Sequence, residues 1–165
     1  MTSRVLGLTD ADLSFFRSEQ KGKLSGTRLK PKQAFMEQQF ELESILSADR
    51  RYRLYRRHHP ENNVIFSVGL AVCLEGEWLT LCRYNGPCHS HRNFIERNKL
   101  IDACHIHTAT QRYIVGAAHP DGFAEETDRY SSVEGAFRCI LTDCNITGIR
   151  PDGDSDPETL DLFFS

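Results

Sequence analysis

Two His-x-His pairs are the residues in this sequence whose type and spacing best suit chemistry. His89 and His91 follow an Asn-Gly-Pro turn, and His105 and His107 lie within a segment that is predicted to be a strand. Residues i and i+2 of a strand project to the same face, so His105 and His107 should point the same way. We expect Ile106 to lie on the buried side of this strand and the two histidines to line a half-open face.

Acid–base cleavage of RNA is the reaction that these imidazoles suit best. Attack of a 2′-hydroxyl on its neighbouring phosphodiester needs a base, an acid and a cation that stabilises the charged oxygens. Histidine can carry out both proton transfers near neutral pH. The sequence therefore predicts His105 and His107 as a catalytic pair without a metal ion, with His89 and His91 assisting them. Whether the protein is an enzyme stays open, and a ribonuclease is the enzymatic interpretation.

Arginine and tyrosine residues near the histidines are the candidates for binding RNA. Residues 50–59 contain five arginines and no acidic residue, and residues 1–60 as a whole carry 12 Lys and Arg against 7 Asp and Glu. Alternation along 51–58 places Tyr52 and Leu54 on one face and the intervening residues on the other. Unpaired bases stack on tyrosine rings and guanidinium planes, while cations bind the phosphates. The predicted substrate-binding residues are Arg53, Tyr55, Arg57, Arg83, Tyr84 and Arg112.

Two other interpretations of the histidines remain open. A His-x-His pair on a strand can supply two ligands to a divalent metal, and Glu96 or Asp102 with a third histidine could complete such a site. The sequence lacks the stronger Cys-x-x-Cys and His-Glu-x-x-His patterns, so we expect no cofactor. The histidines could instead be structural, in a non-catalytic inhibitor or antitoxin-like regulator. Such a protein would bind a protein or nucleoprotein partner through the acidic surface of its C-terminal half, since residues 61–165 carry 16 Asp and Glu against 8 Lys and Arg.

The elements that must position these residues follow from periodicity and from turn and cap signals. Helices are expected over 11–20, 32–47 and 132–143, and strands over 51–58, 64–74, 78–84 and 103–115, with a short edge strand over 145–150. Thr9 or Asp10 would cap the first helix, and residues 131–134 have the spacing of a capping box for the last. Residues 21–32 are expected to form a basic loop. The predicted fold is α+β, an antiparallel sheet of about four to five strands with N-terminal helices and one capped C-terminal helix packed on one face.

Length and composition limit how the chain can be organised. A chain of 165 residues fits one domain, which we assign to 1–150, followed by an acidic, partly flexible tail over 151–165. The hydrophobic fraction of 39% and the charged fraction of 26% are typical of soluble proteins, and the longest apolar run, 64–74, is too short for a membrane helix. No signal-peptide pattern is found, so we expect a cytoplasmic protein without membrane association.

No motif assigns the chain to a family. The sequence contains no Gly-rich phosphate loop, no Ser nucleophile elbow and no dinucleotide fingerprint, which argues against nucleotide-driven enzymes, α/β-hydrolases and Rossmann dehydrogenases. Helices followed by an antiparallel meander are also the layout of compact bacterial ribonuclease toxins, an analogy without a shared motif. The sequence thus predicts a small cytoplasmic protein that engages RNA or another nucleic acid. A toxin-like, metal-independent ribonuclease is one form of this prediction, and a regulator of a protein partner is the alternative.

Overall fold

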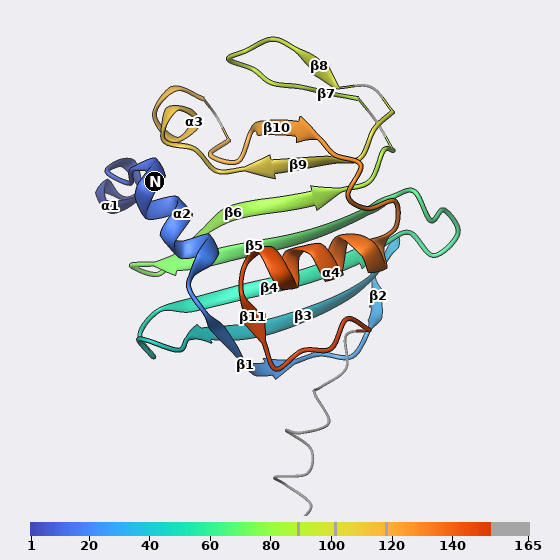
Figure 1. The fold of residues 1–165 in the computed structure, drawn as a ribbon, viewed down its shortest axis with the longest axis horizontal. Coiled ribbons are helices and arrows are strands. Elements are labelled where there is room, and N and C mark those ends of the chain that lie inside the picture. Colours follow the sequence, from blue (N-terminus) through green and yellow to red (C-terminus); the bar gives the residue numbers. More distant parts are fainter. Residues whose placement is uncertain (89, 101, 118, 153–165) are drawn as a thin grey trace, which may run out of the picture.

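A computed structural model describes residues 1–88, 90–100, 102–117 and 119–152. Within these residues, nine strands form one mixed sheet, in which all pairs are antiparallel except β1 with β11 (Figure 1). In pairing order the strands are β10 (Phe123–Glu126), β9 (His105–Thr108), β6 (Glu77–Asn85), β5 (Phe66–Leu74), β4 (Arg51–His58), β3 (Phe35–Ser44), β1 (Lys21–Gly26) and β11 (Ile146–Thr147), and β2 (Lys30–Lys32) pairs with β3.

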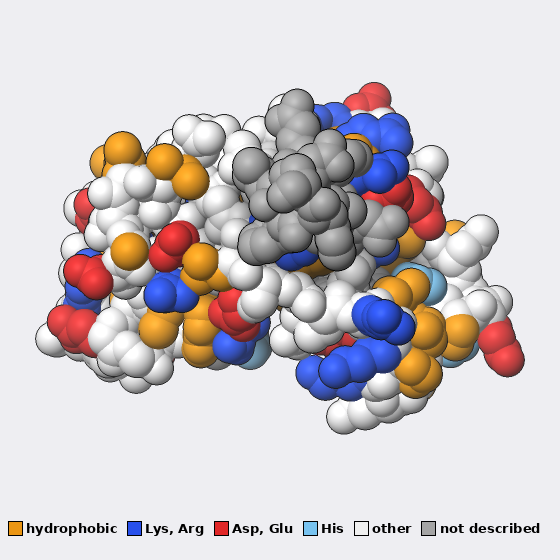
Figure 2. Space-filling model, turned by 90° about the horizontal axis from the view of Figure 1, so that it is seen from below, with side chains coloured by type: hydrophobic (Ala, Val, Ile, Leu, Met, Phe, Trp, Pro, Cys, Tyr) orange, Lys and Arg blue, Asp and Glu red, His pale blue; other side chains and the backbone are white. Residues whose placement is uncertain are grey.

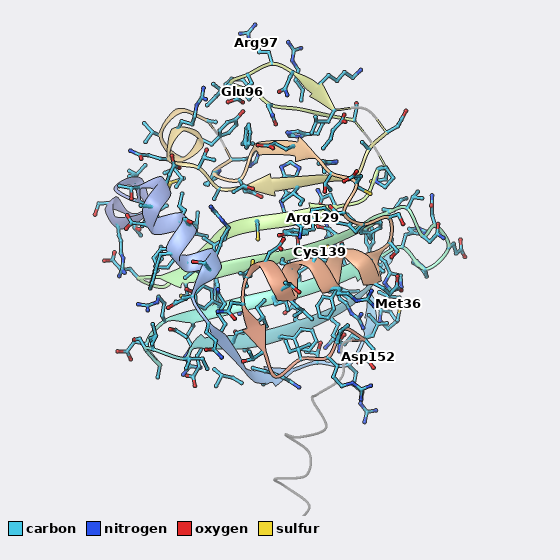
Figure 3. All side chains as sticks on the ribbon, viewed as in Figure 1. Met36, Glu96, Arg97, Arg129, Cys139 and Asp152 are labelled. Atoms are coloured by element: carbon cyan, nitrogen blue, oxygen red, sulfur yellow. The ribbon has the colours of Figure 1, made fainter. Side chains whose placement is uncertain are left out.

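A two-stranded ribbon and four helices complete the described part of the chain. The ribbon consists of β7 (His91–Arg92) and β8 (Lys99–Leu100), and the helices are α1 (Ser3–Leu6), α2 (Asp10–Ser18), α3 (Gln111–Gly116) and α4 (Val133–Asp143). The ribbon lies beside the β10 edge of the sheet, and Glu96 and Arg97 are found at its tip, at the opposite end of the molecule from Asp152 (Figure 3). None of the helices described is long and apolar enough to cross a membrane.

Helix α4 covers one face of the sheet, and the main core lies beneath it. The helix begins after Ser132, whose hydroxyl accepts a hydrogen bond from the backbone N–H of Gly135, as expected for an N-cap. Phe137 and Ile140 are fully buried and pack, with α2, over the central strands (Figure 1). In β4, Leu54 faces this core. We call the opposite side of the sheet, which carries the other set of alternating β4 residues, the far face.

Several expected elements are confirmed. Helix α2 follows Thr9, which forms a reciprocal capping box with Asp12, and α4 matches the capped C-terminal helix, although its N-cap is Ser132 and the capping box expected over 131–134 does not form. The β5–β6 hairpin turns at Glu75 and Gly76, both of which have a positive φ. The edge strand expected over 145–150 is the short β11. The α+β class is therefore correct, with helices on one face of a large sheet.

The sheet is much larger than the four to five strands expected, because two segments were assigned wrongly and β10 was not predicted. The helix expected over 32–47 is β3, and the basic loop expected over 21–32 contains β1 and β2. In β3 the buried residues recur at every second position, as Phe40 and Leu42 show, which is the periodicity of a strand with one buried face. Its Glu, Gln and Met residues favour helices intrinsically, but pairing with β1 and β4 overrides that weak preference.

The long strand expected over 103–115 is also shorter than predicted. Strand β9 ends at Thr108, and the Thr110 side chain accepts a hydrogen bond from the backbone N–H of Tyr113 at the start of α3. This local cap ends the extended conformation, because the hydroxyl satisfies a helix donor that a strand would pair elsewhere. Of the acidic tail expected over 151–165, residues 153–165 lie outside the described part of the chain.

Tyr55 lies across Gly69 on the far face, and this contact requires a glycine. A Cβ atom at Gly69 would lie 2.4 Å from Tyr55 Cε1. The Tyr55 hydroxyl is 3.2 Å from Ser67 Oγ, which donates to Asn85 Oδ1 at 2.7 Å. We expect Gly69→Ala to displace the ring and lower the free energy of unfolding by about 1–3 kcal/mol in urea titrations. In a Tyr55→Ala background the same substitution should cost little, and an equal cost in both backgrounds would contradict the clash.

Candidate functional site

Three of the four predicted catalytic histidines meet in space. The ring centroid of His91 lies 4.5 Å from that of His107 and 5.8 Å from that of His105, and the centroids of His105 and His107 are 5.1 Å apart. His91 comes from β7 and the other two from β9, so the ribbon brings His91 of the first pair to both members of the second. His89 lies outside the described residues. We call His91, His105 and His107 the histidine cluster.

Backbone carbonyls fix the protons of the histidine cluster. His107 Nδ1 lies 2.9 Å from the carbonyl oxygen of Asp121, and His105 Nδ1 lies 3.0 Å from the carbonyl two residues before it. Because a carbonyl oxygen only accepts, each Nδ1 carries a hydrogen. His91 Nε2 likewise donates to the carbonyl of Gly122 at 3.0 Å. Each ring is thereby held in one orientation, and the loop at 121–122 is tied to the cluster.

The two β9 histidines are buried, so the expectation that they line a half-open face is wrong. His105 is 1% exposed and His107 is 4% exposed. The covering segment is anchored by Asn93, whose Oδ1 accepts from Ala124 N at 2.8 Å and whose Nδ2 donates to Ala124 O at 2.9 Å. Asn93 thus pairs with the edge strand β10 and holds His91 over β9. No local sequence pattern indicates this cover, since Asn93 and Ala124 are 31 positions apart.

Burial makes His107 a neutral group at physiological pH. Burial, and to a smaller extent the charge of Arg83 and the neighbouring imidazoles, together lower the pKa of His107 to about 3, although the hydrogen bond to Asp121 acts in the opposite direction. At pH 7 this ring is therefore neutral, with its one hydrogen on Nδ1 bonded to the Asp121 carbonyl, and it is not the imidazolium that a general acid requires. Within the described residues, no group of three or more His, Cys, Asp or Glu side chains is arranged to hold a metal ion.

The predicted binding residues divide between two sides of the sheet. Those on the far face are Arg53, Tyr55, Arg57 and Arg83. Tyr84 is 5% exposed and points the other way, where its hydroxyl donates to Asp143, which also pairs with Arg129 near Cys139 (Figure 3). The alternation of strand residues predicts that Arg83 and Tyr84 face opposite sides of the sheet, so the sequence pattern alone could have placed Tyr84 away from the other binding residues. Arg112 lies in α3, with its Nη1 3.1 Å from Glu96 Oε1.

Two adjoining cavities on the far face share Phe35 and Arg57 and form one groove across β3 to β6. Their volumes are about 270 Å³ and about 390 Å³. The remaining charged lining residues are Lys32, Glu37 and Arg83. We call this surface the Arg57 groove. Lys32 and Phe35 were missed because their segment was expected to be loop and helix. Lys and Arg side chains gather toward the end of the sheet where β2 lies (Figure 2).

Arg57 is the exposed cation at the centre of the groove. Its guanidinium lies 5.1 Å from the centroid of the Phe35 ring, and it makes no ion pair within the described residues. Lys32 Nζ lies 3.5 Å from a carboxylate oxygen of Glu37, and Arg83 Nε lies 2.5 Å from one of Asp121. Glu37 lies opposite Arg57 in the β3–β4 register but is contacted by Lys32, and with three cationic lining residues against one acidic residue the groove keeps a net positive charge.

A second stacked pair lies further along the same face. The Arg53 guanidinium is 4.2 Å from the centroid of the Trp78 ring, and Trp78 is 38% exposed. Arg53 also donates to Glu41 at 2.8 Å. Guanidinium–aromatic pairs of this kind present a flat surface with positive charge at its edge.

No family model, curated protein or solved structure matches this chain. Its function must therefore be inferred from its own residues.

Proposed function

We propose that this protein binds single-stranded nucleic acid, with RNA as the first candidate, in the Arg57 groove. The supporting observation is an exposed guanidinium that has no acidic partner in the described chain and lies over an aromatic ring at the centre of a basic groove. Phosphates are attracted to such a cation, and unpaired bases stack on rings and guanidinium planes. Arg53 and Trp78 extend the same combination along the far face.

The histidine cluster has a positioning role in this proposal. His107 and His91 donate to the carbonyls of Asp121 and Gly122, and the Asp121 carboxylate contacts Arg83 at the groove. The cluster thereby fixes the loop that orients Arg83. Cleavage of the bound RNA by His105 and His107 stays a separate prediction. It needs an acid from elsewhere, since the pKa of His107 is about 3.

Oligonucleotide binding over a salt series tests the groove. The probe is a labelled oligouridine of about ten nucleotides, and its fluorescence anisotropy is measured from about 50 to 200 mM salt. We expect Arg57→Ala to weaken binding about tenfold and to reduce the slope of log K against log salt by about one, because one phosphate contact is lost. Arg138→Ala is the matched control, since this exposed arginine lies on α4 at the opposite face of the sheet.

Three results would overturn the proposal. The first is no binding by the parent protein, and the second is binding that does not depend on salt. The third is an equal effect of Arg57→Ala and Arg138→Ala, which would mean that the loss of any positive charge weakens binding and that the groove has no special role.

A further inference from the structure

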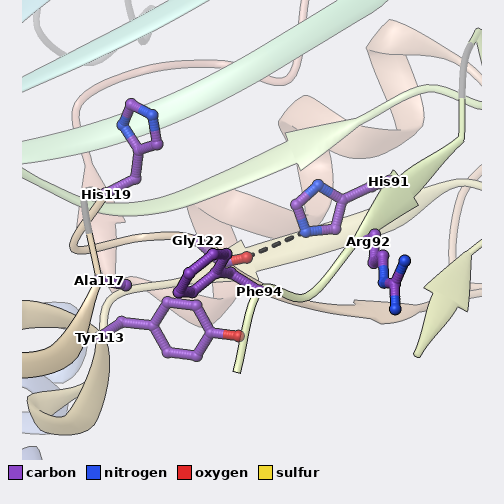
Figure 4. A pocket seen from close by; sticks show the side chains of 7 residues that line it. All are labelled: His91, Arg92, Phe94, Tyr113, Ala117, His119 and Gly122. Carbon is purple, nitrogen blue, oxygen red and sulfur yellow. Dashed lines mark hydrogen bonds between the residues drawn. The ribbon is translucent and has the colours of Figure 1, made fainter. Parts of the chain in front are cut away.

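We infer that a second pocket, beyond the loop at 121–122, takes one unpaired base of the same strand, an inference that rests on the proposed function. The pocket has a volume of about 170 Å³, and the residues that line it include His91, Phe94, Tyr113 and His119 together with Arg92 and Gly122 (Figure 4). This volume is below the roughly 300–1,000 Å³ of pockets for larger ligands, so it suits a single planar ring.

Three of the residues that line this pocket, His91, Tyr113 and Gly122, are held in place before any ligand binds. The Tyr113 hydroxyl donates to Glu96 Oε2 at 2.5 Å and accepts from the backbone N–H of Ile95 at 3.1 Å. A Cβ atom at Gly122 would lie 2.9 Å from the Tyr113 ring, so the loop approaches this ring as closely as only glycine allows. His91 is fixed by its bond to the Gly122 carbonyl. A pocket formed in advance loses less entropy when a base enters.

Phe94 is the ring that the fold leaves without cover. It is 72% exposed, and none of the described aromatic rings stacks on it. Exposed aromatic rings are the usual platforms for unpaired bases, and stacking does not depend on base identity. The neighbouring Arg92 supplies a cation for the adjoining phosphate. Ring and cation therefore fit a nucleotide better than an uncharged apolar ligand.

The pocket and the Arg57 groove are linked by two consecutive residues of one loop, Asp121 and Gly122. Gly122 lines the pocket, and Asp121 contacts Arg83 in the groove. Because one loop borders both sites, the inference places a phosphate of the strand at the groove and a neighbouring base against Phe94. The two sites together would then bind one ligand.

Phe94→Ala tests the pocket in the same oligouridine titration. We expect about tenfold weaker binding, the usual effect of losing one stacked base, with the salt slope unchanged because no charge is removed. Val115→Ala is the matched control, since Val115 is 70% exposed, lies on α3 and does not line the pocket. Both side chains are exposed, so neither variant should affect folding.

The outcomes separate the two proposals. Weaker binding by Phe94→Ala, with Val115→Ala unchanged, supports the pocket. If Arg57→Ala weakens binding while Phe94→Ala and Val115→Ala both match the parent protein, the pocket inference is overturned and the groove stands. If the parent protein does not bind the oligouridine, the proposed function fails, and the pocket inference fails with it.

Discussion

Acidification from neutral pH to about pH 4 is expected to lower the free energy of unfolding by about 3 kcal/mol through His107 alone. Burial, and then the charge of Arg83 and the imidazoles of His91 and His105, lower the pKa of His107 from 6.5 to about 3. Below pH 6.5 the unfolded chain takes up a proton that the folded protein does not. Stability is therefore complete above this pH and is lost as the pH falls toward 3.

Urea unfolding of the parent protein and His107→Gln at several pH values measures this contribution. Glutamine removes the titrating ring and keeps an N–H that can donate to the Asp121 carbonyl. We expect the loss of stability between neutral pH and about pH 4 to be smaller in the variant by about 3 kcal/mol. His119→Gln is the control, because His119 is exposed. Parallel pH curves for the parent protein and His107→Gln would contradict a neutral, buried His107.

Glu19→Gln is expected to lower the free energy of unfolding by about 3 kcal/mol or more at neutral pH. The Glu19 side chain is 1% exposed and accepts hydrogen bonds from Arg50 at 2.6 and 2.9 Å, from Ser44 Oγ at 2.8 Å and from the Tyr52 hydroxyl. Burial raises the pKa of Glu19, but these bonds outweigh it and the pKa is lowered. Glutamine keeps the shape of the Glu19 side chain but removes its charge and replaces one oxygen by an NH₂ group. This group points toward side chains that themselves donate hydrogen bonds, so some of these buried donors are left without an acceptor.

Glu41→Gln is the matched surface control for this prediction. Arg53 Nε donates to Glu41 at 2.8 Å, but both side chains are 40% exposed. Exposed pairs of this kind contribute at most about 1 kcal/mol, because water screens the charges. Both variants are measured by urea unfolding at neutral pH. Equal costs for Glu19→Gln and Glu41→Gln would mean that the Glu19 network does not stabilise the core.

Local patterns predicted the parts of this fold that depend on neighbours in sequence. Alternation in β4 placed Tyr52 and Leu54 toward the core and the intervening residues on the far face. Cap signals placed α2 and α4, because a hydroxyl near a helix start bonds within its own turn. The spacing of His105 and His107 correctly put both rings on one side of β9.

The features that were missed depend on contacts between distant residues. Strand β3 was expected to be a helix because its composition favours one, and its partners lie in β1 and β4. The burial of His105 depends on the pairing of Asn93 with the edge strand, which no periodicity reveals. Phe35 and Lys32 contribute to the groove only once β2 and β3 pair. Sequence reasoning thus named Arg57 and Arg83 but missed Lys32 and the shape of the groove.

The most direct test of the central claim is to locate the bound strand. Oligouridine that contains photoreactive 4-thiouridine is crosslinked to the full chain, and the attached peptides are identified by mass spectrometry. We predict crosslinks to the segments that carry Phe35, Tyr55 and Trp78, which lie on the far face beside Arg57 and Arg53. Crosslinks confined to α4 and the face that it covers would contradict the groove as the binding site.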